Sequence, residues 1–132
     1  MFWITPLAAA ALTLVYIRLA LNVIGLRRSN KVSLGSGGVD ALERAIRAHG
    51  NFSEYVPLGL ILMFALEWNK APTLLVATLG ALLVAGRLIH AKGIQETGTF
   101  KNRILGMKLT FGSLGLLALA NVGWLAFNAL KS

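Results

Sequence analysis

The sequence alternates between four long apolar segments and three short polar connections. Each apolar segment is rich in leucine and alanine and offers about the 20 residues of helix that a bilayer crossing needs. Membrane strands would be shorter and would alternate in polarity. The pattern predicts an all-α fold, an integral membrane four-helix bundle, with residues 1–132 forming a single domain. The predicted spans are Phe2–Leu26, Val39–Trp68, Pro72–Ala91 and Ile104–Leu130.

Lysine and arginine gather on one side of this predicted bundle. The first connection, Arg27–Gly38, is basic and rich in glycine and serine, and the third, Lys92–Asn102, is polar and basic. The second, Asn69–Pro72, is a tight turn with few charges. The positive-inside rule therefore places the first and third connections in the cytoplasm and both termini outside. The first segment lacks the basic start of a cleavable signal peptide, so we expect it to be a retained span.

Composition supports a membrane location and excludes several kinds of site. The 132 residues are 56% hydrophobic with a mean hydropathy of +0.69, which is too apolar for an ordinary soluble domain. The net charge of +8 comes from residues that flank apolar segments, so we expect anionic ligands and no nucleic acid. The absence of cysteine excludes disulfides and thiolate–metal sites, and neither histidine has the spacing of a metal site, so we expect no metal.

Among the ionisable residues inside the predicted spans, an acid and two arginines on three different helices fall at a similar depth. A helix rises 1.5 Å per residue, so with Trp68 at the outer boundary Glu54 lies about 21 Å inward. Similar counts place Arg18 about 21 Å and Arg87 about 24 Å inward on two other helices. Because unpaired charges in a membrane cost several kcal/mol, we expect Arg18, Glu54 and Arg87 to face each other or a wet cavity. The alternative is a purely structural role, in which these charges hold the helices in register.

A stripe of polar residues follows one face of the second predicted helix. Glu43, Arg47, Asn51 and Glu54 follow i, i+4, i+8 and i+11 spacing. The stripe offers a guanidinium for a carboxylate, an amide for peptide groups and a carboxylate for an ammonium. This set suits a small zwitterionic or peptide-like ligand. Further positive charge is available at the neighbouring helix ends, from Arg27, Arg28 and Arg103.

Small residues mark the expected contacts between helices. Ala77, Ala81 and Ala85 form a stripe on the third predicted helix, and Gly112 and Gly115 lie on the fourth. Small residues let membrane helices approach closely. We therefore expect both sets to be packing seams.

The segment ERAIRAHGNFSEYVP, residues 43–57, resembles the signature of the MAPEG family, the membrane-associated proteins of eicosanoid and glutathione metabolism. That signature is close to E-R-x-x-R-A-x-x-N-x-x-E-Y-x-P. The segment AGRLIHAKG, residues 85–93, resembles the end of the family's third helix. The four-span layout agrees along essentially the whole chain, and its small size and GSGG loop are similar to short bacterial members.

The resemblance implies a homotrimer that binds glutathione between subunits near the cytoplasmic face. Arg47 would pair with a glutathione carboxylate, and Glu54 would receive the γ-glutamyl ammonium. His90 lies where eukaryotic relatives carry a ligand-facing tyrosine, and Arg103, with Lys101 as a rival, is the candidate to stabilise the thiolate. The glutathione-binding set implied by the resemblance is Arg27 or Arg28, Arg47, Asn51, Glu54, Tyr55 and His90.

The sequence therefore favours a glutathione transferase or peroxidase of a bacterial inner membrane. Its second substrate would be a lipophilic electrophile or lipid hydroperoxide that arrives through the membrane lipid. The alternative is a non-catalytic trimeric binding or scaffold protein that keeps the fold. A small transporter or ion-conducting bundle is a third, less favoured reading. The sequence identifies neither the second substrate nor the pathway.

Overall fold

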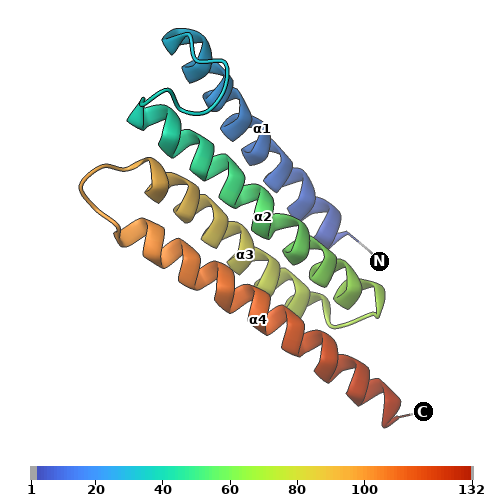
Figure 1. Cartoon of the computed structure of the whole chain (residues 1–132). Coiled ribbons are helices and arrows are strands. Elements are labelled where there is room, and N and C mark those ends of the chain that lie inside the picture. Colours follow the sequence, from blue (N-terminus) through green and yellow to red (C-terminus); the bar gives the residue numbers. More distant parts are fainter. Residues whose placement is uncertain (1–2, 132) are drawn as a thin grey trace.

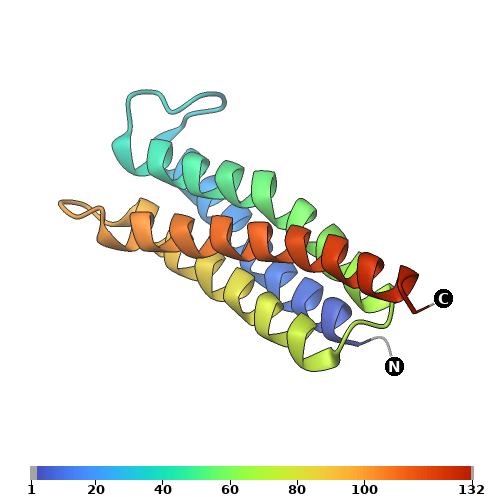
Figure 2. The same cartoon turned by 90° about the horizontal axis from the view of Figure 1, so that it is seen from below.

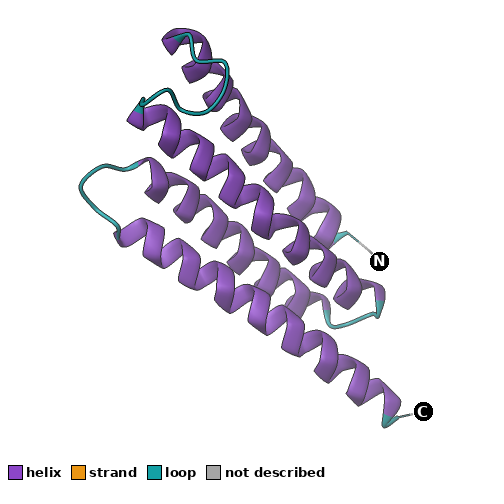
Figure 3. Cartoon of the chain, viewed as in Figure 1, coloured by secondary structure: helices purple, strands orange, loops and turns teal. Residues whose placement is uncertain are grey.

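Four long antiparallel helices make up the fold (Figure 1). The computed structural model describes residues 3–131, and within this part it has no strand (Figure 3). The predicted all-α membrane bundle is confirmed; the predicted start of the first span at Phe2 lies outside the described residues. The helices are α1 (Ile4–Asn30), α2 (Asp40–Trp68), α3 (Thr73–Gln95) and α4 (Lys101–Ala129).

Three of these helices extend further into polar sequence than the apolar pattern indicated. α1 continues through Arg27 and Arg28 and is closed by Lys31 in the left-handed conformation, with φ 53°. α3 runs on to Gln95, and α4 begins at Lys101. Hydrophobicity marks the stretch that prefers a membrane, whereas helical hydrogen bonding continues beyond it into water. The basic residues of the first connection therefore begin on a helix.

α2 differs from its neighbours in polarity. α1, α3 and α4 are each long and apolar enough to cross a membrane, whereas α2, although as long, is not apolar enough. Its first half carries the charged stripe, and Glu67 adds a charge near its end. Pro57 lies inside α2 without ending it. The bundle thus holds one amphipathic helix among three apolar ones.

α3 and α4 pack closely through glycines. A Cβ added to Gly86 would lie 2.9 Å from the Thr110 backbone nitrogen, and one on Gly93 would collide with the backbone of Arg103. A Cβ added to Gly106 would lie 2.6 Å from the Cα of His90. Van der Waals contact needs more room than this, so only glycine allows these approaches. The seam lies at the basic end of the helix pair.

The expected glycine seam on α4 does not form within the chain. Gly112 and Gly115 have nothing within 4 Å of an added Cβ, and both are exposed. Their face of α4 points away from the rest of the chain. The spacing identified glycines on one helix, but it did not show which side of that helix its neighbours occupy.

The two ends of the bundle carry different connections between helices (Figures 1 and 2). The α1–α2 and α3–α4 loops lie together at one end, called here the basic end, and the α2–α3 turn lies at the other. At this other end the Glu67 carboxylate accepts hydrogen bonds of 2.7 Å from three successive backbone amides at the start of α1. Trp124 donates its indole N–H to the Asn69 carbonyl at 2.8 Å. These contacts place Trp3, Trp68 and Trp124 at the end opposite the basic loops.

Candidate functional site

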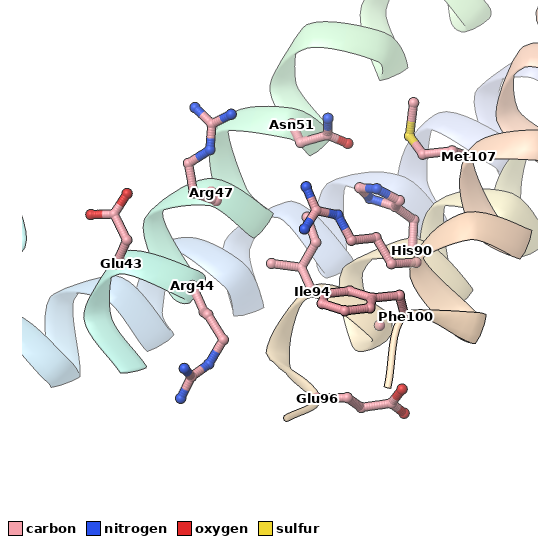
Figure 4. A pocket seen from close by; sticks show the side chains of 11 residues that line it. Glu43, Arg44, Arg47, Asn51, His90, Ile94, Glu96, Phe100 and Met107 are labelled. Atoms are coloured by element: carbon pink, nitrogen blue, oxygen red, sulfur yellow. The ribbon is translucent and has the colours of Figure 1, made fainter. Parts of the chain in front are cut away.

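A pocket at the basic end lies between α2, α3, α4 and the α3–α4 loop (Figure 4). Its cavity volume is about 460 Å³, within the range of ordinary small-molecule sites. Three arginines and two glutamates contribute to its wall. The lining residues are Glu43, Arg44, Arg47, Asn51, His90, Gly93, Ile94, Glu96, Phe100, Arg103 and Met107.

α2 supplies one wall of the pocket. Arg44, Arg47 and Asn51 follow spacings of three, four and seven residues, which bring side chains to adjoining positions on a helix. Figure 4 shows Asn51 and His90 toward the middle of the pocket, from α2 and α3, with Glu43 and Arg47 farther out along α2. Arg44 is half-buried and Arg47 is exposed. Both guanidinium groups remain available for an anionic ligand.

The fully buried Arg87 positions the Asn51 side chain through a hydrogen bond. Arg87 donates through Nη2 to Asn51 Oδ1 at 2.8 Å and through Nη1 to Thr110 Oγ1 at 3.3 Å. Its guanidinium also lies 5.6 Å from the ring centroid of Phe52 and 5.5 Å from that of Tyr55, within cation–π range. Arg87 thus links α2, α3 and α4. Because the Asn51 carbonyl oxygen is occupied, its amide nitrogen is the group left to donate into the pocket.

His90 and Arg103 come from helices that the glycine seam holds together. His90 is buried and packs against Gly106. Its Nδ1 has no hydrogen-bond partner within residues 3–131. Arg103 lies in the first turn of α4, where Gly93 packs directly on its backbone. The close approach of α3 to α4 therefore brings a histidine and an arginine to the same pocket.

The α3–α4 loop closes one side of the pocket. Asn102 donates through Nδ2 to both carboxylate oxygens of Glu96 at 2.9 Å. This bond ties the end of α3 to the start of α4. Phe100 adds an exposed aromatic ring to the wall, and Met107 adds a flexible thioether. The pocket combines fixed charge with an apolar side.

Five of the residues expected from the sequence lie at this pocket: Glu43, Arg47, Asn51, His90 and Arg103. Four further residues line it although the sequence predicted no site role for them: Arg44, Glu96, Phe100 and Met107. Arg44 could have been found, because it lies seven residues before Asn51 and therefore on nearly the same face. Loop residues Glu96 and Phe100 carry no periodic signal. Their positions depend on how the α3–α4 loop folds back.

The other expected ligand residues lie elsewhere in the chain. Arg27 donates through Nη1 to the Gly35 carbonyl at 2.9 Å and so holds the α1–α2 loop. Arg28 is exposed beyond the pocket, and Glu54 is exposed on α2. Tyr55 packs edge-on against Phe111, with ring centroids 5.5 Å apart. A single chain does not bring these four residues into the pocket.

The expected buried network of Arg18, Glu54 and Arg87 does not form within the chain. Of the three, only Arg87 is buried, and its hydrogen-bond partners are neutral. Glu54 stays on the exposed stripe of α2, and Arg18 is exposed on α1 beside α3. Counting residues along each helix predicted the depth of these side chains, but the rotation of each helix about its axis decided which side chains meet. No ion pair joins any two of these residues.

Together, the apolar helices define an integral membrane protein with a charged pocket at one end. The sequence matches the MAPEG family over residues 5–123. The chain belongs to this family, as its signature segment indicated. It is 36% identical to the inner membrane protein YecN of Escherichia coli K12 over 129 residues, covering 98% of each chain. YecN of the O6:H1 strain CFT073 gives the same identity and coverage. The chain is therefore a membrane protein of the glutathione and eicosanoid metabolism family.

Proposed function

We propose that this protein binds glutathione in the pocket at the basic end and acts as a glutathione transferase or peroxidase. The observation that carries the proposal is the convergence of Arg44, Arg47, Asn51, His90 and Arg103 on one cavity. Glutathione carries two carboxylates, an ammonium, two peptide groups and a thiol. Guanidinium groups suit the carboxylates, and the Asn51 amide suits a peptide carbonyl. Glu43 and Glu96 supply negative charge for the ammonium within the same pocket.

The reaction would depend on forming the glutathione thiolate. A free thiol has a pKa near 8.5, so lowering that pKa by about one unit takes roughly 1.4 kcal/mol of stabilisation. Arg103 is the proposed donor, because its guanidinium group lies at the pocket. The thiol proton leaves to water as the thiolate forms. No protein base is then required.

Two outcomes are open to such a thiolate. In a transfer reaction sulfur forms a bond to an electrophilic carbon, and the leaving group departs with the bonding electron pair. In a peroxidase reaction sulfur attacks a hydroperoxide oxygen, the O–O bond breaks, and the resulting alkoxide takes a proton. A second glutathione then displaces water from the oxidised sulfur and gives the disulfide. Lipophilic substrates would enter through the membrane lipid.

A homotrimer would complete the site. Glu43, Arg47 and Glu54 form an exposed charged stripe along α2, although the rest of the bundle is apolar. A bilayer disfavours such a stripe, so another subunit is the natural cover. Residues outside the pocket of one chain, among them Arg28, Glu54 and Tyr55, would then reach glutathione at the subunit boundary.

The membrane location proposed is the inner membrane, with the basic end in the cytoplasm and both termini outside. The similarity to YecN, an inner membrane protein, supports the membrane assignment. The gathering of both basic loops at one end and of three tryptophans at the other supports the orientation. Glutathione in the cytoplasm would then reach the pocket directly.

Titration calorimetry on the detergent-purified protein tests this proposal. We expect glutathione to bind, its thiolate absorbance to appear in the ultraviolet, and an aryl halide or lipid hydroperoxide to be turned over. Arg103→Ala should keep binding but lose the thiolate signal, whereas Lys131→Ala, a change at the opposite end, should alter neither. Binding without thiolate or turnover would favour the non-catalytic binding protein. Absence of binding would refute both.

A further inference from the structure

A second groove runs between α1 and α3, outside the glutathione pocket. Its part near the basic end has a cavity volume of about 580 Å³ and a polar lining that includes Arg18, Asn22, Lys92 and Gln95. The adjoining part toward the other end has a volume of about 410 Å³ and is almost entirely apolar. Leu88 lines both parts. The two cavities therefore form one groove with a charged end and an apolar end.

The charged end presents two cations at one level. Asn22 donates to Gln95 across the groove at 3.4 Å, which fixes the register of α1 against α3. Arg18 lies four residues and Lys92 three residues inward from this pair, about 5 Å in each case. Both cations are exposed and neither forms an ion pair within the described chain. Glu96 also lines this part of the groove, and both oxygens of its carboxylate accept hydrogen bonds from Asn102.

Arg18 needs an anion that the chain does not supply. It lies inside α1, a helix apolar enough to span the membrane, and about 18 Å from the end of that helix at Asn30. An arginine at such a depth is costly unless it is paired or its long side chain reaches the interface. At the interface that this side chain can extend toward, the abundant anions are the phosphates of lipid headgroups.

The apolar end has room for a chain of methylene groups. Ala8 and Ala11 of α1 face Ala77, Gly80 and Ala81 of α3 across it. These small side chains leave the groove unfilled, and the expected helix–helix seam on α3 is therefore a furrow in this chain. From Leu88 to Ala77 the furrow extends about 17 Å along α3.

We propose that the α1–α3 groove binds an anionic phospholipid, with its phosphate at Arg18 and Lys92 and an acyl chain along the alanine furrow. Charge complementarity favours this occupant over a second copy of the chain. A two-fold contact of two copies through this face would bring Arg18 and Lys92 against their own equivalents, and like charges repel. In the proposed homotrimer, whose contacts join different faces, the exposed charged stripe of α2 is the face that calls for another subunit. The proposal goes beyond the glutathione function and does not depend on it.

Lipid titration of the detergent-purified full chain tests the proposal. Phosphatidylglycerol and phosphatidylcholine are added separately, and binding is followed by native mass spectrometry and by the rise in the unfolding temperature. Phosphatidylglycerol has a net negative charge, whereas the choline group offsets the phosphate charge of phosphatidylcholine. Each cation near a net anionic headgroup contributes about a fivefold gain in affinity, so the two cations should make phosphatidylglycerol bind about 25-fold more tightly than phosphatidylcholine. Arg18→Gln and Lys92→Gln should each remove about fivefold of this preference. Lys108→Gln removes an exposed cation of α4 outside the groove and should leave the preference unchanged.

A second pair of variants tests whether the acyl chain binds in the alanine furrow. Ala81→Phe fills the furrow and should weaken both lipids, whereas Ala118→Phe, at an exposed alanine of α4, should weaken neither. Equal binding of the two lipids by the natural protein would overturn the proposal, as would an unchanged preference in Arg18→Gln and Lys92→Gln. Stabilisation by glycerol phosphate alone to the same extent would show a soluble anion site instead. Oxidative cross-linking of Leu88→Cys, in a chain without other cysteines, would show that a second copy covers the groove.

Discussion

Replacing Gly106 by alanine should separate α3 and α4, the two helices that build much of the pocket at the basic end. The added methyl group would lie 2.6 Å from the His90 Cα and closer still to the His90 backbone nitrogen. Backbone atoms of α3 cannot rotate away as a side-chain tip could, so α4 must shift. The shift would act where His90 and Arg103 approach each other.

Gly112→Ala supplies the matched control. Both glycines lie on α4, but an added Cβ at Gly112 meets nothing within 4 Å. Alanine gains up to about 1 kcal/mol over glycine in a helix, and both variants share this gain. Overpacking a close contact costs about 1–3 kcal/mol, and only Gly106→Ala bears that cost. The difference in unfolding free energy between the two variants should therefore be about 1–3 kcal/mol.

Two measurements check this reasoning. Denaturation of the detergent-solubilised protein gives the stability difference, and glutathione titration gives the affinity of each variant. We expect Gly106→Ala to be the less stable and the weaker binder, and Gly112→Ala to match or exceed the natural protein in both. Equal stabilities for the two variants would mean that the α3–α4 approach is looser than the glycine contacts require.

Three further predictions concern individual side chains. Arg47→Ala should weaken glutathione binding by about 10- to 100-fold in calorimetry, because a charge-assisted hydrogen bond contributes about 1.5–3 kcal/mol; an unchanged affinity in folded protein would remove Arg47 from the site. Glu54→Ala should also weaken binding, as the family resemblance implies, but only in the assembled oligomer, so a loss that persists in a monomer separated by size would contradict a subunit-boundary role. Glu67→Ala should lower the unfolding free energy by about 1–3 kcal/mol, since three amides at the start of α1 lose their acceptor. Glu67→Gln should lose less stability because it keeps one carbonyl oxygen. Equal unfolding midpoints for the natural protein and Glu67→Ala would show that these hydrogen bonds do not stabilise the fold.

The sequence by itself determined the architecture. Apolar segments of bilayer length separated by basic loops required membrane helices, because no other element of that length satisfies its backbone in lipid. The four-residue spacing of Arg47 and Asn51 placed them near one face of α2, because residues i and i+4 of an α-helix lie on the same side. The signature segment then identified the MAPEG family, and with it the nature of the ligand to be tested.

Tertiary structure decided which faces meet. Rotation of each helix about its axis is set by packing against its neighbours, and periodicity within one helix cannot report it. This rotation left Gly112 and Gly115 exposed, placed Gly106 against His90, and put Arg18 on a groove beside α3 instead of opposite Glu54. The fold of the α3–α4 loop likewise added Glu96 and Phe100 to the pocket, because contacts between residues on different elements follow from three-dimensional packing and not from local spacing.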